Sequence, residues 1–241
     1  MDNYQILTSA TSTNSVLKTM NIDELPPFFM LIAQQQTAGR GRGNNTWESE
    51  PDKNLLASIL LKPQIAPCQQ FNICRMVSLA VCKTLTDYCR IEHVKIKWPN
   101  DIYVNDKKIA GILIEHQICG NTIKYSIIGI GLNVNQTSFS PAIPNPTSIV
   151  LKTCHEFDTL SIGKQIVDNI KFYNNLAQDR LEDAYRQLLY RLNEPASFII
   201  NESGTRISAT IQGVSPNGCL SLLMPDNSIQ NFELNELKYV L

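Results

Sequence analysis

The 241-residue sequence is poor in the residues from which metal sites and nucleophilic triads are usually built. It has only three histidines, His93, His116 and His155, and no two of them lie at the spacing of a metal-ligand pair. Its seven cysteines are odd in number and contain no Cys-x-x-Cys pair, which argues against a zinc site or a disulfide framework. We therefore expect no resident metal, reduced thiols and a cytoplasmic protein.

Long apolar runs and an excess of one charge sign are also lacking. No segment approaches the length of a membrane span, and residues 1–4 lack the basic and apolar parts of an export signal. Lysine and arginine total 21 against 22 acidic residues, so broad attraction to nucleic acid or a membrane is not expected. The length allows one large domain with a smaller one.

The sequence does contain a basic glycine loop, Gly39-Arg40-Gly41-Arg42-Gly43, followed by Trp47. Alternating glycines disfavour regular structure and let the backbone approach a ligand, while arginine forks suit phosphate or carboxylate. Both flanks, 28–33 and 55–61, are typical of buried strands. A charged surface turn or a fragment of an RNA-binding tail would be the alternatives. A single copy between two core strands favours a site for an anionic, planar ligand.

Periodicity and turn signals predict an α+β chain. The turn at 193–195 precedes three further turn signals in about 45 residues, which predict a small all-β unit, an open barrel. We accordingly expect domains at 1–192 and 193–241. The expected strands are 4–7, 28–33, 55–61, 94–98, 102–104, 109–115 and 122–132. The expected helices are 16–20, after an N-cap at 12–14, then 69–89 and one long helix at 160–192. The segment 136–147 is expected to be an irregular loop.

Three further motifs carry polar or glycine residues at unusual places. Lys108 opens an apolar strand soon after the motif Lys97-Trp98-Pro99-Asn100-Asp101. Burying a lysine there is costly unless its ammonium meets an anion; the alternative is that the side chain simply ends in solvent. Gly129 and Gly131 near a strand end suggest a ligand against the backbone. Neither a dinucleotide fingerprint nor a P-loop is present. Ser12-Thr13-Asn14 is typical of a helix N-cap.

Together and in this order, these motifs resemble the biotin protein ligases, over about residues 9–135. The resemblance implies a mixed β-sheet catalytic domain flanked by helices, similar to class II aminoacyl-tRNA synthetases, with a small C-terminal SH3-like β-barrel. It implies an ATP-dependent ligase that activates biotin as biotinyl-5′-AMP. The biotinyl group is then transferred to a lysine of a biotin carboxyl carrier protein, as in acetyl-CoA carboxylase. Mg²⁺ would arrive with ATP.

The resemblance also assigns site residues. It makes Lys108 and Arg42 the catalytic residues. The biotin-binding residues that it implies are Ser12, Thr13, Asn14, Gln36, Gly39, Arg40, Gly129 and Gly131. The nucleotide-binding residues that it implies are Arg42, Trp47, Asn100, Asp101, Lys108 and Asn133.

Two departures from the family pattern affect these expectations. The segment 43–46 is less basic than in many relatives, which weakens the expectation of extra phosphate contacts there. The catalytic strand is expected from Tyr4, so we expect no N-terminal DNA-binding domain, no repressor function and no DNA partner. We also expect the loop 39–47 to be mobile without ligand and ordered over biotinyl-AMP.

Several alternatives stay open. A lipoate or octanoate ligase or transferase of the same fold shares the lysine before an apolar strand. A nucleic-acid-binding module and a non-catalytic regulatory protein are the other classes. The carrier protein and the oligomeric state are undetermined, with a homodimer as one option. The C-terminal unit would either help transfer and carrier docking or only stabilise the fold.

Overall fold

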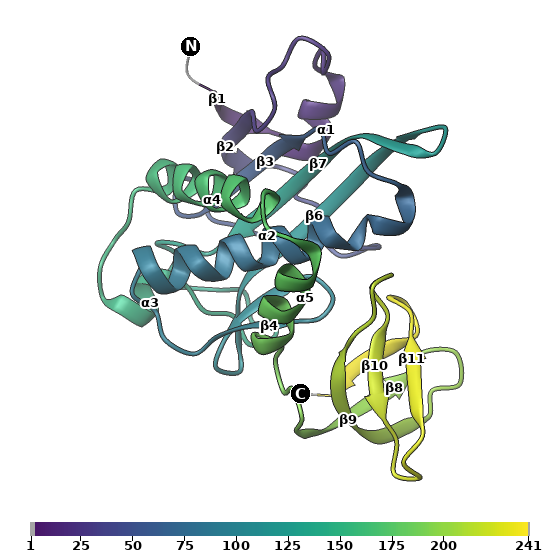
Figure 1. Ribbon diagram of the computed structural model, residues 1–241. Helices are drawn as coiled ribbons and strands as arrows, with labels where there is room; N and C mark the ends of the chain where they lie inside the picture. The colour runs from purple at the N-terminus through teal and green to yellow at the C-terminus, as the bar shows by residue number, and fades with distance from the viewer. Residues whose placement is uncertain (1–2, 241) are drawn as a thin grey trace.

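A seven-stranded mixed sheet forms the larger part of the computed structural model, which describes residues 3–240 (Figure 1). The strand order is β1-β2-β3-β7-β6-β5-β4; β1 and β2 are parallel, and all other neighbours are antiparallel. The strands are Tyr4–Ala10 (β1), Met30–Gln36 (β2), Leu55–Leu61 (β3), Val94–Lys97 (β4), Asp101–Val104 (β5), Lys107–Cys119 (β6) and Thr122–Leu132 (β7).

Five α-helices accompany this sheet: Thr13–Thr19 (α1), Phe71–Lys83 (α2), Ile149–Thr153 (α3), Thr159–Asn174 (α4) and Gln178–Gln187 (α5). Helix α2 packs against both α4 and α5 over one face of the sheet (Figure 1). Within residues 3–240, no helix has the length and apolar character needed to cross a membrane.

The two faces of the sheet carry different side chains because strand residues alternate. In β3, Leu55, Ala57 and Ile59 join the core under α2 and α4, whereas Leu60 joins a smaller cluster with Leu17 of α1. In β3, the residues of the larger cluster therefore occupy alternate positions of the strand. The α1 face also carries Ser58 and two glycines of β7, and this polar, glycine-lined region becomes the floor of the site described below.

A second, five-stranded antiparallel sheet follows α5, in the order β11-β10-β9-β8-β12. It fits the small SH3-like unit that the sequence predicts, and it lies beside the larger sheet in Figure 1. Its strands are Pro195–Ile200 (β8), Arg206–Val214 (β9), Leu220–Leu223 (β10), Ile229–Phe232 (β11) and Leu237–Val240 (β12).

A buried arginine joins the two sheets. Arg75 of α2 is 1% exposed and donates hydrogen bonds to the carbonyl oxygens of Ser215 (2.7 Å) and Pro216 (3.3 Å) beyond β9. Its guanidinium lies 4.7 Å from the centre of the Phe71 ring and 3.6 Å from a carboxylate oxygen of Glu182. A buried charge is costly unless it is paired and hydrogen-bonded. These contacts therefore stabilise the packing of α2 against the segment beyond β9.

The prediction of a mixed sheet with flanking helices is confirmed, but two predicted helices are too long. The helix expected at 160–192 is wrong: residues 175–177 interrupt it, and Ala177 has extended ψ of 146°. This break lets α5 pack separately on α2. The helix expected at 69–89 leaves α geometry after Lys83, where the Thr84 hydroxyl donates to the Ala80 carbonyl (2.9 Å) and a π-helical turn follows.

Candidate functional site

The predicted motifs meet in a cleft of about 990 Å³ on the α1 face of the larger sheet. This volume lies within the usual range for small-ligand and cofactor sites, about 300–1,000 Å³. The sequence-predicted residues that line it are Ser12, Thr13, Asn14, Gln36, Arg40, Arg42, Trp47, Asn100, Asp101, Lys108, Gly129, Gly131 and Asn133. Gly39 is the exception, because it is buried at the base of the glycine loop rather than in the cleft wall.

The glycine loop folds back on itself as a short hairpin. The Trp47 amide donates to the Gly39 carbonyl (2.9 Å), and the Gly41 amide donates to the Asn45 carbonyl (2.8 Å). A Cβ at position 39 would overlap the Trp47 carbonyl oxygen, and Gly43 has a φ of +62°, in the left-handed region. These two glycines are therefore required by the shape of the loop itself.

The Trp47 side chain lies flat against glycines of two neighbouring strands. A Cβ on Gly131 would overlap the indole, and a Cβ on Gly111 would come within 3.0 Å of it. Lys108 Nζ lies 5.6 Å from the centre of the Trp47 ring. Among residues 3–240, the buried indole N–H has no hydrogen-bond acceptor. The ring thus supplies a flat apolar wall and one free donor.

Lys108 lies at the junction of β5, β6 and the loop 136–147. Its ammonium contacts a carboxylate oxygen of Asp101 (2.6 Å), and its amide donates to the Asn145 carbonyl (2.7 Å). Asn100 Nδ2 donates to the Ile112 carbonyl (2.9 Å), which fixes the turn before β5 against β6. Asn100 therefore acts in this structure through the backbone that carries Asp101.

The C-terminal sheet holds two cations at the other end of the cleft. Arg42 donates from Nη2 to Asn235 Oδ1 (2.7 Å), and burial lowers the pKa of Arg42. Lys97 Nζ lies 4.6 Å from the centre of the Tyr239 ring and 5.3 Å from that of Tyr103. Burial lowers the pKa of Lys97, and the nearby Lys108 lowers it further. Attraction to the Asp101 carboxylate raises the pKa of Lys97 and partly opposes these effects.

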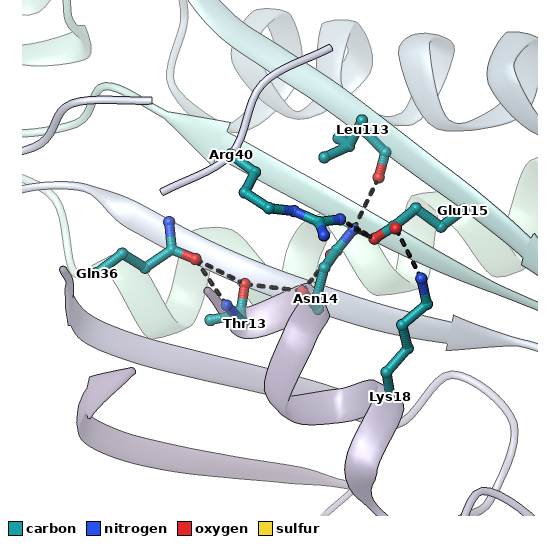
Figure 2. A network of polar contacts seen from close by, with 8 residues as sticks. Thr13, Asn14, Lys18, Gln36, Arg40, Leu113 and Glu115 are labelled. Atoms are coloured by element: carbon teal, nitrogen blue, oxygen red, sulfur yellow. Dashed lines mark hydrogen bonds and ion pairs between the residues drawn. The ribbon is translucent and has the colours of Figure 1, made fainter. Parts of the chain in front are cut away.

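A network of polar groups occupies the α1 end of the cleft (Figure 2). Gln36 Oε1 accepts from the Thr13 amide (2.7 Å) and hydroxyl (3.1 Å), and the Ser58 hydroxyl donates to Asn14 Oδ1 (2.5 Å). Asn14 Nδ2 donates to Glu115 Oε2 (2.8 Å). Such a network supplies oriented donors and acceptors to a polar ligand ring.

Glu115 is the anion of this network. It accepts from Lys18 Nζ (2.8 Å) and contacts Arg40 Nη2 (2.6 Å) in addition to Asn14 (Figure 2). Burial raises the pKa of Glu115, but the hydrogen bonds from these three partners outweigh that effect and lower it from 4.5 to about 2. The carboxylate is therefore ionised at neutral pH.

Asn133 and Ser12, two of the predicted site residues, differ in how the backbone uses their side chains. Asn133 is buried and donates from Nδ2 to the Thr147 carbonyl (2.9 Å), so its amide closes the loop 136–147. Ser12 stands at the N-cap of α1, yet its side chain makes no capping hydrogen bond. Its hydroxyl is therefore not used by the helix.

Sequence reasoning missed several residues of the cleft. The sequence predicts Lys97 only as a residue of the strand 94–98, and Glu115 only as the end of an apolar strand. The C-terminal residues gave no signal, because a separate sheet brings them to the cleft. The residues that the C-terminal sheet and its turns contribute are Asn201, Leu234, Asn235, Leu237, Lys238 and Tyr239. The residues that the loop 136–147 contributes are Phe139, Ala142, Ile143, Pro144, Asn145 and Pro146.

Comparisons with known proteins agree with this geometry. The chain is 35% identical over 133 residues to the bifunctional ligase/repressor BirA of Bacillus subtilis, covering 55% of this chain but only 40% of that relative. It is 29% identical over 209 residues to a biotin–[acetyl-CoA-carboxylase] ligase of Paracoccus denitrificans, covering 81% and 84% of the two chains.

Structural similarity extends over the whole chain. A biotin protein ligase from Aquifex aeolicus, solved with biotin and ATP, superposes with a TM-score of 0.81 at 26% identity, covering 100% of this chain and 99% of that one. The model of the biotin/lipoate A/B protein ligase family matches residues 6–133, more than half of the sequence. The chain therefore belongs to the biotin/lipoate A/B protein ligase family.

Proposed function

We propose that this protein is an ATP-dependent ligase that activates biotin as biotinyl-5′-AMP and transfers the biotinyl group to a lysine of a biotin carboxyl carrier protein. The observation that carries this proposal is the place of Lys108. Its ammonium lies beside the Trp47 wall, between the polar network at one end of the cleft and the cations Arg42 and Lys97 at the other. A carboxylate from one end and a phosphate from the other meet at this lysine.

In the first step, a carboxylate oxygen of biotin attacks the α-phosphorus of ATP. A C–O–P mixed anhydride forms, and the bond from the α-phosphorus to the bridging oxygen breaks, so pyrophosphate leaves with that electron pair. Two anions must approach each other, which positive charge fixed in a partly dehydrated cleft makes possible. Lys108 faces both reacting groups, and it exchanges its contact with Asp101 for contacts with the substrates. Arg42 clamps the phosphates.

In the second step, the amine of the acceptor lysine attacks the carbonyl carbon of the mixed anhydride. An amide bond forms, the bond from carbonyl carbon to phosphate oxygen breaks, and AMP leaves, while the attacking amine loses its proton. Lys108 remains beside the leaving phosphate and stabilises its charge. The loop 39–47 limits access of water, which would otherwise hydrolyse the anhydride.

The network at the α1 end is proposed to bind the biotin ring. Ser12, Thr13, Asn14 and Gln36 supply its donors and acceptors, and Gly129 leaves room for Asn14, whose Oδ1 would lie 2.6 Å from a Cβ at that position. Arg40 and Gly39 shape the loop beside it, and Gly131 seats the Trp47 wall.

The nucleotide is proposed to occupy the end of the cleft near the C-terminal sheet. Trp47, Arg42 and Lys108 would face it, with Asn100, Asp101 and Asn133 shaping that end through the contacts described above. Mg²⁺ would neutralise part of the triphosphate charge. We propose that this ion arrives with ATP and is held mainly by the triphosphate oxygens.

The experiment that tests this function is incubation of the purified protein with labelled biotin, ATP-Mg²⁺ and a carrier domain. We expect label transfer to one lysine of the carrier, and a loss of at least about a hundredfold in Lys108→Ala and Arg42→Ala. Lys107→Ala is the matched control, because Lys107 is an exposed neighbour on the same strand that does not line the cleft. Transfer of lipoate or octanoate in place of biotin would support the alternative function instead.

Compartment and assembly belong to the same proposal. All seven cysteines are free, which fits a reducing, cytoplasmic location. We propose a homodimer as the assembly to test, by sedimentation with and without biotin and ATP. We also propose domains at 1–192 and 193–241, and the division of the strands into two separate sheets supports this proposal.

A further inference from the structure

A row of cross-strand partners runs across the cleft face of the larger sheet, from β7 to the edge strand β4. Its members, in order, are Gly131, Gly111, Asp101 and Lys97. Partners directly opposite each other point to the same face of a sheet, and each step to the next strand is about 4.8 Å. The two glycines seat the Trp47 ring, and the Lys108 ammonium lies over the middle of the row, in contact with Asp101 (2.6 Å). A ligand that extends from the Trp47 wall past Lys108 therefore reaches Lys97 next.

Lys97 ends this row as a cation without a partner anion. Its cross-strand partner Asp101 pairs with Lys108 instead, and among residues 3–240 Lys97 forms no ion pair. Burial and the neighbouring Lys108 ammonium both lower the pKa of Lys97. A half-buried ammonium in this position is favoured by any anion that enters the cleft.

Two aromatic rings hold the Lys97 ammonium in place of an anion. Its Nζ lies 4.6 Å from the ring centre of Tyr239 in β12 and 5.3 Å from that of Tyr103 in β5. Both distances lie within the range of about 6 Å over which an aromatic face attracts a cation. Each ring is packed in turn, Tyr239 against Phe198 (5.0 Å between ring centres) and Tyr103 against Tyr190 (5.4 Å). An aromatic face attracts the ammonium without neutralising it, so the charge stays available to a ligand.

The residue after Lys97 fixes the C-terminal sheet against the end of β4. Trp98 is 1% exposed, and its Nε1 donates to the Gly218 carbonyl (2.9 Å) in the turn between β9 and β10. The ring of Tyr239 therefore reaches Lys97 through an anchor that involves neither of these two side chains.

We infer that Tyr239 is a positioning residue for the first step, in which its ring holds Lys97 as an unpaired cation for the phosphates that leave as pyrophosphate. The order along the row carries this assignment, because the α-phosphorus is proposed to lie at Lys108 and the phosphates beyond it extend toward the edge of the sheet. The inference rests on the proposed function. It gives the C-terminal sheet a part in the activation of biotin that is separate from any docking of the carrier.

The test measures the two steps separately on the full chain. Biotin-dependent ATP–pyrophosphate exchange reports the first step, and single-turnover transfer from synthetic biotinyl-5′-AMP to a carrier domain reports the second. In Tyr239→Leu we expect kcat/KM for ATP in the exchange to fall about five- to thirtyfold. KM for biotin and the transfer rate from biotinyl-5′-AMP should stay within about twofold of the wild type, because neither involves the leaving phosphates. Tyr239→Phe keeps the ring face and should restore kcat/KM for ATP.

A matched control separates this role from loosening of the C-terminal sheet. Phe232 is a ring of the same sheet with nearly the same burial, 8% exposed against 9% for Tyr239, and it does not line the cleft. Phe232→Leu should therefore leave kcat/KM for ATP within about twofold of the wild type. In the Lys97→Met background, Tyr239→Leu should change kcat/KM for ATP by less than about twofold, since no ammonium is left to position.

A second variant keeps the inference testable if Tyr239→Leu does not fold. Tyr103→Leu removes the other ring from the larger sheet, and it should lower the same kcat/KM only when Lys97 is present. An unchanged exchange in Tyr239→Leu, an equal loss in Phe232→Leu or in the Lys97→Met background, or an equal loss in transfer from biotinyl-5′-AMP would each overturn the inference. A wild-type protein without biotin-dependent exchange would instead overturn the proposed function.

Discussion

Replacing Gly131 by alanine tests the seat of the Trp47 side chain. The Cβ of an alanine there would overlap the indole at Cε2 and would lie only 2.7 Å from Cδ2 and 2.8 Å from Cζ2. Ordinary carbon contacts are about 3.5–4.0 Å, so the ring has to move by about 1 Å. Gly131 is paired on both sides, with Leu56 and Gly111, and the backbone has little freedom to move instead.

The size of the effect follows from the overlap. Overpacking of this kind costs about 1–3 kcal/mol, and if the displaced ring carries that cost into the substrate complex, kcat/KM falls about 5- to 160-fold. The stability of the free protein should fall less, because the indole lies at the edge of a cleft and can move outward. We therefore expect the free-energy loss calculated from kcat/KM for biotin transfer to exceed the loss in the free energy of unfolding measured with urea.

The assay is a double-mutant cycle in steady-state biotin transfer. Gly131→Ala is measured in the wild-type background and in Trp47→Ala, where no indole is left to displace. The reasoning predicts that alanine at 131 changes kcat/KM by less than about threefold in the Trp47→Ala background. An equal loss in both backgrounds, or a Gly131→Ala enzyme within twofold of the wild type, would refute the assigned contact.

Four further outcomes are expected. Asn235→Ala removes the acceptor that holds Arg42 and should raise KM for ATP about threefold to tenfold without changing KM for biotin; an unchanged KM for ATP would contradict that role. Lys97→Met should slow ATP–pyrophosphate exchange about tenfold, and a rate within twofold of the wild type would remove this cation from the mechanism. Tryptic cleavage in 39–47 should be suppressed by biotin with a non-hydrolysable ATP analogue, and equal cleavage with and without ligands would rule out an ordering loop. Because the pKa of Glu115 is lowered from 4.5 to about 2, its stabilisation is complete above pH 4.5 and is lost as pH falls through 2. The gap in urea midpoint between wild type and Glu115→Gln should therefore be constant above about pH 5 and narrow below it, and a gap independent of pH would exclude the ionised pairing.

The sheet was predictable where the chain is continuously apolar. Strand β3 is buried at all seven positions, and β7 matches the expected 122–132. Strand β6 runs further than expected, to Cys119, because its last residues are exposed yet still pair with β7. Pairing with a neighbour extends a strand beyond the apolar run that identifies it.

The helix break was not predictable from the residues. Positions 175–177 contain neither glycine nor proline, and the apolar spacing continues across them from Ile170 to Leu181. Packing against α2 decides where the chain turns, and a contact between distant segments leaves no local signal.

Much of the candidate site was predictable because its motifs lie at strand ends and turns, which the sheet brings together. Glu115 could have been found from strand alternation, since it shares a face with Gly111. Asn235 and Tyr239 could not, because a second sheet carries them to the cleft. Their contribution depends on how the two sheets dock.

That docking has a consequence for how an acceptor protein is met. The Arg75 guanidinium donates to backbone carbonyls beyond β9, so swinging the sheets apart would break these hydrogen bonds and the packing around the guanidinium. The rim of the cleft, built from both sheets, therefore keeps its shape before any encounter. This protein then loses little conformational entropy when an acceptor domain binds. The association rate should be governed by diffusion and charge rather than by an opening step.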